Sequence, residues 1–206
     1  MAHFCDSCMS YCARSPLPAL CFVCDTQWLA TYACPSCLKQ TLITRLFWIG
    51  AFSSPVLQRG IYALKYDFRR SIGKNFGVLL AGRLEQCEPC TIVPVPLSRK
   101  RESYRGFNQA LVIAEGIARV SGWTVRTDLV ERVRDTPPQA QRATPEERGV
   151  NVAHAFESTP AAHRAMPERI LIIDDVWTTG STMSAVAQQF KKNGAKEIFG
   201  AVVAKG

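Results

Sequence analysis

The feature that most constrains the fold is a short apolar run that ends in two adjacent acidic residues and a turn rich in hydroxyl groups. The apolar run spans Ile170–Ile173, and the residues after it read DDVWTTGST. A continuous apolar run of this length is typical of a strand covered on both faces, as in a parallel sheet. The turn leads into a segment of helical periodicity that ends before Gly194. This order predicts an α/β fold with a mainly parallel sheet flanked by helices.

The turn itself has the chemistry of a phosphate-binding loop. Parallel sheets bind ligands outside the carboxyl ends of their strands, and the free N–H groups that begin the next helix favour an anion. Gly180 allows the backbone to approach such an anion closely. Two aspartates can accept hydrogen bonds from vicinal ribose hydroxyls or position Mg²⁺ through waters. The residues expected to bind a phosphorylated sugar are Asp174, Asp175, Thr178, Thr179, Gly180, Ser181 and Thr182.

The formal net charge of +8 comes mostly from two basic clusters. Residues 59–74 carry five cations against one aspartate, and residues 99–105 carry four cations against one glutamate. Such clusters suit a polyanionic partner such as pyrophosphate, a nucleotide or nucleic acid, although each could also be a solvated basic face. Around Arg105-Gly106 we expect a mobile loop that could close over a ligand. The expected pyrophosphate loop comprises Pro96, Leu97, Arg99, Lys100, Arg101 and Arg105, and the candidates for a catalytic role are Lys65, Lys100 and Arg105.

Seven of the nine cysteines lie between Cys5 and Cys37. Six of them form CxxC pairs, and two such pairs supply the four thiolates that structural Zn²⁺ prefers. The simplest complete site uses Cys5, Cys8, Cys21 and Cys24, while Cys34 and Cys37 could replace one of these pairs. A further pair, Cys87-x-x-Cys90, is either a pair of loop thiols or a distant partner. We therefore expect a small zinc-ribbon-like module over residues 1–47 and a second domain over residues 48–206.

In that second domain, helix and strand signals alternate. We expect helices over 54–66, 72–86, 108–119 and 181–193, strands over 91–95, 129–133, 170–173 and 198–204, and a loop with a helical turn over 134–148. The first residues lack the pattern of a signal peptide. The most apolar run, over 42–52, is about half the ~20 residues needed to span a bilayer. These features predict a cytoplasmic protein without a membrane span.

The combination of motifs resembles the ComF family of competence-associated proteins, which join an N-terminal zinc finger to a type I phosphoribosyltransferase domain. The resemblance rests on the CxxC pairs and on the runs ALKY (63–66), PVPL (94–97), RGFNQA (105–110) and DDVWTTGST (174–182), with a weaker series between Gln139 and Phe156. It implies the type I phosphoribosyltransferase fold, a structural Zn²⁺, and phosphoribosyl pyrophosphate (PRPP) with Mg²⁺ as ligand. Some relatives carry a fourth CxxC pair soon after the third, which would complete a second zinc site, whereas here an apolar stretch without such a pair follows Cys37.

The resemblance also implies a role in natural transformation, in which single-stranded DNA and the competence DNA-translocation machinery are partners, in the cytoplasm or at the inner face of its membrane. Tyr66, Phe68, Tyr104 and Phe107 lie among the cations and could stack on bases. Two alternatives stay open. One is an active phosphoribosyltransferase of nucleobase metabolism, for which the sequence lacks a recognisable base-binding hood, although the Cys-rich module could occupy that place. The other is a non-catalytic PRPP sensor.

Overall fold

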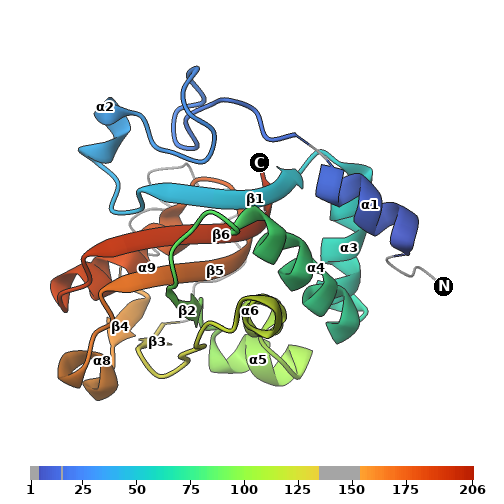
Figure 1. Ribbon diagram of the computed structural model, residues 1–206. Helices are drawn as coiled ribbons and strands as arrows, with labels where there is room; N and C mark the ends of the chain where they lie inside the picture. The colour runs from blue at the N-terminus through green and yellow to red at the C-terminus, as the bar shows by residue number, and fades with distance from the viewer. Residues whose placement is uncertain (1–4, 15, 135–153) are drawn as a thin grey trace.

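The computed structural model describes residues 5–14, 16–134 and 154–206. Its centre is a four-stranded parallel sheet in the order β1-β6-β5-β2 (Figure 1). The strands are β1 (Arg45–Ala51), β2 (Thr91–Pro94), β5 (Arg169–Trp177) and β6 (Glu197–Lys205). Because all four run in one direction, their carboxyl ends meet at the same edge, where a ligand site is expected.

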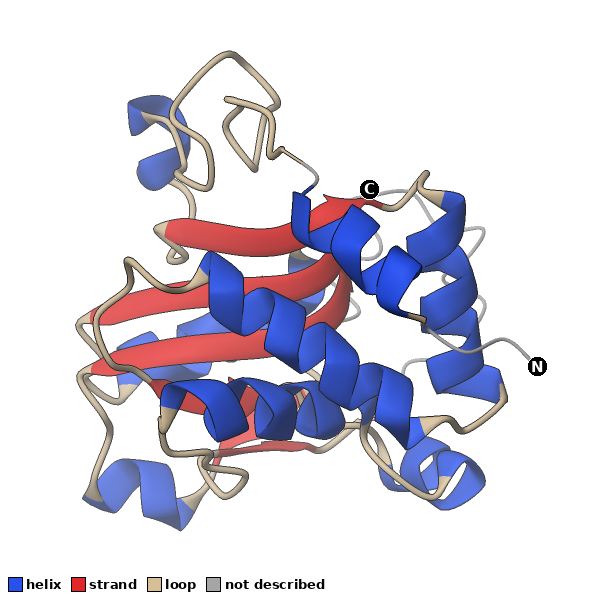
Figure 2. Ribbon diagram, turned by 45° about the vertical axis from the view of Figure 1, so that its right-hand side comes forward, coloured by secondary structure: helices blue, strands red, loops and turns tan. Residues whose placement is uncertain are grey.

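Helices cover both faces of this sheet (Figure 2). One face carries α3 (Pro55–Tyr66), α4 (Arg70–Arg83) and α6 (Gln109–Ser121), and α1 (Asp6–Arg14) packs on α4. The other face carries α9 (Ser181–Lys192), the hairpin of β3 (Val130–Arg132) and β4 (Phe156–Ser158), and α8 (Pro160–Arg164). The short helices α2 (Pro35–Leu38) and α5 (Arg99–Arg105) lie in connections.

The two faces explain the continuous apolar run in β5. Leu171 and Ile173 belong to the core formed with α3, α4 and α6, whereas Ile170 and Ile172 belong to the core formed with α9. All four side chains are fully buried. The prediction of a mainly parallel sheet flanked by helices is therefore confirmed. Among the described residues, no helix is both long enough and apolar enough to cross a bilayer.

The structure extends the predicted elements and contains further ones that were not predicted, among them α8 and β4. The strand predicted over 170–173 continues to Trp177, so both aspartates belong to its carboxyl end. Neither α1 nor β1 was expected, and β1 crosses the boundary predicted after residue 47. The helix α1 buries only Cys12, which leaves almost no periodic signal. The loop predicted over 134–148 lies outside the described residues, apart from Arg134.

Two glycines let α4 and α6 pack with their backbones in contact. A Cβ added to Gly77 would lie 2.4 Å from the carbonyl oxygen of Ile113, and one added to Gly116 would lie 2.6 Å from that of Lys74. Carbonyl oxygens cannot move aside as a flexible side chain can. The glycines therefore set the distance between the two helices that support one side of the sheet.

We predict that Gly77→Val lowers the free energy of unfolding by ~3 kcal/mol, because the helices must separate to admit the side chain. Urea denaturation measures this. The matched control is Gly82→Ala in the same helix, where an added Cβ meets nothing within 4 Å, and a gain of about 0.5–1 kcal/mol is expected from helix propensity. Equal losses at both positions would contradict the close packing.

Candidate functional site

The turn between β5 and α9 is held by a glycine and a buried tryptophan. Gly180 is the N-cap of α9 with φ 74°, a left-handed conformation that favours glycine. A Cβ at this position would lie 2.3 Å from the ring of Trp177, so the glycine also admits the indole. Trp177 in turn packs edge-on against Phe22, with ring centroids 5.4 Å apart. Phe22 belongs to the segment between α1 and β1, residues 16–44, hereafter the Cys-rich segment. The indole thus packs beneath the backbone of the turn at Gly180 and holds the loop in place, a role that the sequence motif does not reveal.

Above the carboxyl ends of β2 and β5 lies a cavity of about 280 Å³, hereafter the carboxyl-end cavity. It gathers most of the predicted site residues from five separate segments. Those that line it are Lys65, Pro96, Leu97, Arg101, Arg105, Asp174, Asp175 and Thr182. Thr178, Thr179, Gly180 and Ser181 form the adjoining turn, while Arg99 and Lys100 lie on α5 and do not line it. Arg99 instead lines a neighbouring cavity with Arg132.

An ion pair across the cavity sets its charge. The Nζ of Lys65, from the last turn of α3, lies 2.8 Å from an oxygen of Asp175, and both side chains are largely buried. Burial opposes the charge on Lys65, but the attraction of Asp175 outweighs it and raises the pKa of the amine. The pKa of Asp174 rises to about 7, first because its carboxylate is desolvated and then because Asp175 repels it. The two adjacent aspartates are therefore not equivalent.

The RGFNQ run supplies the other wall of the cavity. Asn108 caps α6 by accepting from the N–H of Ala110, and its amide donates to the carbonyl of Val95 at 2.9 Å, which fixes the helix to the strand end. Arg105 donates to the Oε1 of Gln109 at 2.9 Å. The Nε2 of Gln109 is buried and has no hydrogen-bond partner in the described part of the chain. A buried donor without a partner is destabilising, and here it lines the cavity, where a ligand oxygen would satisfy it.

The predicted mobile loop around Arg105–Gly106 has a defined structure. Residues Arg99–Arg105 form α5, whose N-cap Ser98 accepts from the N–H of Arg101. Gly106 ends the helix in the left-handed conformation, with φ 71°. The helix, rather than an open loop, presents the cations. Sequence reasoning also left out Arg132, which reaches the cavity from β3 and carries no local signal of that role.

The Cys-rich segment forms one four-cysteine cluster. The sulfur atoms of Cys21, Cys24, Cys34 and Cys37 all lie within 4.8 Å of one another. The N–H of Cys34 donates to the sulfur of Cys21 at 3.3 Å, a contact that favours a thiolate. Such a set fits a tetrahedral metal ion such as Zn²⁺.

The thiols of this cluster are polarised by their neighbours. Hydrogen bonds from Thr26 lower the pKa of Cys24 to about 6, with the hydroxyl oxygen 3.1 Å from the sulfur. Burial, followed by contacts with the other three cysteines, raises the pKa of Cys37. The shifts oppose each other because one thiol donates to its ionised neighbour. A metal ion would replace the shared protons with direct sulfur bonds.

This grouping corrects the simplest expectation, which joined Cys5 and Cys8 to Cys21 and Cys24. The sulfurs of Cys5 and Cys8 lie 3.7 Å apart at the start of α1, which packs on α4, and neither belongs to the four-cysteine cluster. The alternative in which Cys34 and Cys37 replace one pair is the arrangement found. Cys87 and Cys90 interact with each other and supply no sulfur to the four-cysteine cluster.

Comparisons with known proteins agree with these features. The model of the phosphoribosyl transferase domain matches residues 108–206. DNA utilization protein YhgH of Salmonella typhimurium is 32% identical over 80% of this chain and 74% of its own length. The chain belongs to the ComF family.

Other relatives carry competence names. Competence protein F of Haemophilus influenzae is 29% identical over 84% of this chain and 78% of its own length. Competence protein ComFC of Streptococcus pneumoniae is 28% identical over 90% of this chain and 87% of its own length. The structure also overlaps that of TT1426 from Thermus thermophilus with a TM-score of 0.35 at 19% identity, over 63% of this chain and 72% of that one.

The cysteine grouping predicts which substitutions remove metal. The unmodified protein is expected to bind about one zinc ion per chain. Cys24→Ser and Cys34→Ser are each expected to lose this ion, because three thiolates bind zinc far more weakly than four. Atomic emission on the purified proteins measures it. Cys5→Ser is the matched control and should keep its zinc. Loss of zinc in the Cys5 variant, with retention in the Cys34 variant, would refute the grouping.

The raised pKa of Asp174 predicts a pH-dependent gain in stability for Asp174→Asn. The unfolded carboxyl titrates near 3.8 and the folded one near 7, so the charged form destabilises the fold fully above that pH and progressively less as the pH falls. At about pH 8 the variant should be more stable by roughly 2 kcal/mol, and the difference should vanish near pH 4.

Thermal or urea unfolding across this pH range measures the difference. The amide keeps the oxygen that accepts from the N–H of Asp175 at 2.8 Å. Asp128→Asn serves as control, because this exposed carboxylate pairs with Arg126, which lowers its pKa, and no gain is expected there. A pH-independent gain at Asp174 would contradict the assigned charge state.

Proposed function

We propose that this protein binds PRPP with Mg²⁺ in the carboxyl-end cavity and handles single-stranded DNA during natural transformation. The observation that carries the proposal is the convergence of cations, acids and one unsatisfied donor, Gln109, on a single cavity beside a helix N-terminus. PRPP presents the matching chemistry, which is a 5′-phosphate and a pyrophosphate joined through a ribose with vicinal hydroxyls.

Each part of the ligand has a proposed partner. The 5′-phosphate would lie at the turn before α9, where Thr179, Ser181 and Thr182 offer hydroxyl groups at a helix N-terminus. The ribose hydroxyls would donate hydrogen bonds to the carboxylates of Asp174 and Asp175. The pyrophosphate would face Arg101 and Arg105, the guanidinium groups suited to bidentate phosphate contacts, with Gln109 as a further donor. Thr178 and Gly180, the members of the PRPP set with no proposed ligand contact, would shape the turn.

Mg²⁺ would neutralise the pyrophosphate between Asp174 and the cations, and Zn²⁺ would occupy the four-cysteine cluster. Lys65 is placed to hold the Asp175 side chain in position against the ribose. If the protein is an active phosphoribosyltransferase, Lys65 and Arg105 are the groups near enough to stabilise a departing pyrophosphate, whereas Lys100 does not line the cavity. A non-catalytic PRPP sensor would use the same contacts without turnover.

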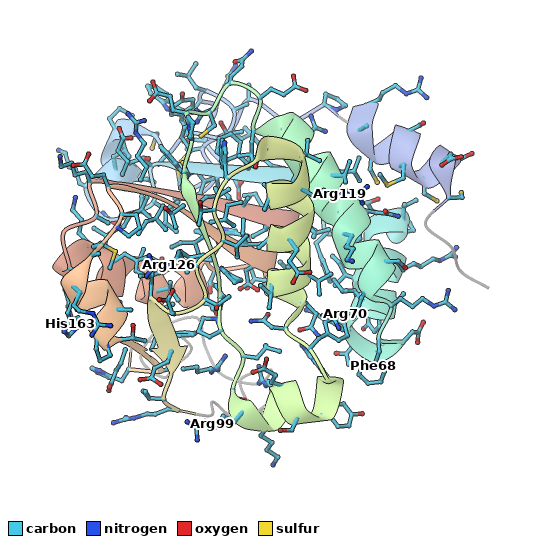
Figure 3. The ribbon with its side chains drawn as sticks, turned by 60° about the horizontal axis from the view of Figure 1, so that its bottom comes forward. Phe68, Arg70, Arg99, Arg119, Arg126 and His163 are labelled. Atoms are coloured by element: carbon cyan, nitrogen blue, oxygen red, sulfur yellow. The ribbon has the colours of Figure 1, made fainter. Side chains whose placement is uncertain are left out.

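Single-stranded DNA is proposed to bind an exposed aromatic surface beside this cavity, formed by Tyr62, Tyr66, Phe68 and Tyr104. These side chains are 44–75% exposed. Two ring pairs have centroid distances of 5.3 and 6.3 Å. Rings open to solvent among cations suit bases and the phosphates that join them. Figure 3 shows Phe68 and Arg70 near the turn that joins α3 to α4, with Arg99 at the start of α5. Phe107, by contrast, is 7% exposed and covered by Arg70, so it is excluded from stacking.

The names of the relatives favour this role. They are competence and DNA utilization proteins, and the competence DNA-translocation machinery is accordingly the proposed partner. A cytoplasmic position, free or at the inner membrane face, would place the protein where an incoming strand emerges.

The test measures both ligands on one zinc-loaded preparation. Calorimetric titration of PRPP with Mg²⁺ is expected to give binding that falls at least about tenfold in Gln109→Glu, because a donor becomes a carboxylate that repels phosphate. Anisotropy of a labelled single-stranded oligonucleotide is expected to show salt-sensitive binding that falls about tenfold in a Phe68→Ala, Tyr104→Ala double variant.

Each substitution serves as the control for the other ligand, since the double variant leaves the cavity intact. Trp28→Ala, which removes a half-exposed ring on the Cys-rich segment, should change neither affinity. The absence of PRPP binding in the unmodified protein would reject the cavity assignment. DNA binding that is insensitive to both salt and the aromatic substitutions would reject the surface.

A further inference from the structure

The last CxxC pair of the chain, Cys87-x-x-Cys90, belongs to neither the metal cluster nor the ligand cavity. Its sulfurs lie outside the four-cysteine cluster, and neither residue lines the carboxyl-end cavity. The pair lies in the connection from α4 to β2, directly before Thr91. Because the sheet is parallel, the start of β2 is at the edge opposite the carboxyl-end cavity. We refer to Cys87 and Cys90 as the amino-edge dithiol.

The connection holds the two thiols near each other in a turn. The N–H of Cys87 donates to the carbonyl of Leu84 at 2.8 Å, directly after α4. Pro89 has a fixed φ, which narrows the range of backbone conformations between the cysteines. The thiol of Cys90 lies 3.2 Å from the carbonyl oxygen of Glu88 and also interacts with the sulfur of Cys87. Two thiols that already interact need little backbone movement to form a disulfide.

The two thiols differ in their access to solvent. Cys87 is half-buried, whereas Cys90 is 6% exposed and belongs to the core formed with α4 and α6. In thiol–disulfide exchange, the first thiolate must reach a sulfur of the incoming molecule, and the second thiol needs to reach only the first. Cys87 therefore has the position of an attacking cysteine and Cys90 that of a resolving one.

Arg45, at the start of β1, supplies positive charge near Cys87. Its guanidinium group lies over the rings of Tyr32 and Phe47, 4.5 Å from each centroid. Its Nε is buried and has no hydrogen-bond partner within the described part of the chain. The rings hold the group in place without neutralising it, and its charge favours the thiolate of Cys87.

These neighbours lower the pKa of Cys87 to about 7. The thiol of Cys90 contributes most, because it donates a hydrogen bond to the ionised sulfur. Burial opposes this shift, and the attraction of Arg45 adds to it. The pKa of Cys90 is raised, first because it is the donor of that hydrogen bond and then because it is buried. Near neutral pH, therefore, the accessible thiol ionises much more readily than the buried one.

Metal binding and plain core packing explain this pair less well. Among the described residues, no group of three or more potential metal ligands includes either sulfur, and two thiolates are half of the set that structural Zn²⁺ prefers. A pair that only packs in the core would not need a half-buried thiolate beside a cation. In a chain of alternating strands and helices, a CxxC pair with these properties is typical of a redox dithiol.

We propose that the amino-edge dithiol is a redox-active pair that exchanges with small peptide disulfides. The thiolate of Cys87 attacks one sulfur of the disulfide, the S–S bond breaks, and one thiolate leaves and takes up the proton that Cys87 had released. Cys90 then loses its proton and attacks the sulfur of Cys87, and the second small thiolate leaves with that proton. The protein gives up two electrons and forms the Cys87–Cys90 disulfide, while the small disulfide is reduced to two thiols.

An open cavity beside the dithiol has room for such a molecule. Its volume is about 680 Å³, and Cys90, Trp123 and Arg169 are among the residues that line it. Arg169 pairs with Glu88 and Glu197, yet its side chain is still 42% exposed. A ring and a guanidinium group in one open cavity suit a small peptide that carries carboxylates.

Glutathione and its disulfide are the probes, in buffers of graded ratio, on the zinc-loaded full chain. After quenching and alkylation, trypsin releases residues 84–99 as one peptide, because it cleaves after Arg83 and Arg99. Cys87 and Cys90 are the cysteines of this peptide, so mass spectrometry counts their labels directly. The count is expected to fall from two to zero in a single two-electron transition as the fraction of glutathione disulfide rises.

Three variants assign the roles within the dithiol. Cys90→Ser should keep glutathione on Cys87 as a mixed disulfide, because the resolving thiol is gone. Cys87→Ser should react at least about tenfold more slowly, because the remaining thiol is buried. Arg45→Met should move the pH midpoint for alkylation of Cys87 upward from about 7, a shift that a purely structural role would not produce. Gln86→Ala, at an exposed position in the same connection, is the matched control and should change none of these results.

Two results would overturn the proposal. One is a peptide that keeps both labels at the most oxidising ratio in a folded chain. The other is a Cys87→Ser variant that reacts with glutathione disulfide as fast as the unmodified protein. Neither measurement involves PRPP or DNA, so the outcome is independent of the proposed function.

Discussion

The ion pair between Lys65 and Asp175 is the interaction on which the candidate site depends. Two adjacent carboxylates at the end of a buried strand cannot both be charged without a compensating cation. Lys65 supplies that cation from the last turn of α3. Lys65 pairs directly with Asp175, whereas burial and then the repulsion from Asp175 raise the pKa of Asp174 to about 7. A ligand that brings a divalent cation would favour the ionised form of Asp174, so ligand binding and proton release are linked at this position.

Much of the phosphoribosyltransferase core follows from local sequence signals. The strand of β5, the turn after it and α9 are contiguous, so hydrophobic periodicity and the turn residues suffice to predict them. The same is true of α3, whose N-cap and proline mark its start. Elements that depend on distant partners were not predictable in this way. The helix α1 buries one cysteine against α4, and β1 becomes a strand through pairing with β6, more than a hundred residues later.

The site residues likewise fall into those marked by a local sequence pattern and those placed by distant contacts. The aspartates and the hydroxyl-rich turn carry a contiguous pattern, whereas Arg132 comes from a different strand and Trp177 acts through a ring contact with Phe22. The cysteine grouping shows the limit most clearly. Three identical CxxC pairs carry no information about which two meet, and the packing of α1 on α4 decides it by holding the first pair apart from the others. Sequence spacing thus identifies the ligand type but leaves the partner choice to tertiary structure.

The N-terminal region therefore has two structural roles rather than one. Its first helix is part of the main core, while the segment that follows covers the edge of β1, where Thr31 accepts from the N–H of Leu46 at 2.7 Å. An uncovered edge strand is a site for unwanted pairing, so this segment protects the sheet. The same segment reaches the end of β6 through Asp25 and the phosphate loop through Phe22. This segment has four clustered thiols but no hydrophobic core of its own. A metal ion bound by the thiols would therefore stabilise the covered edge of β1 together with the contacts made by Asp25 and Phe22.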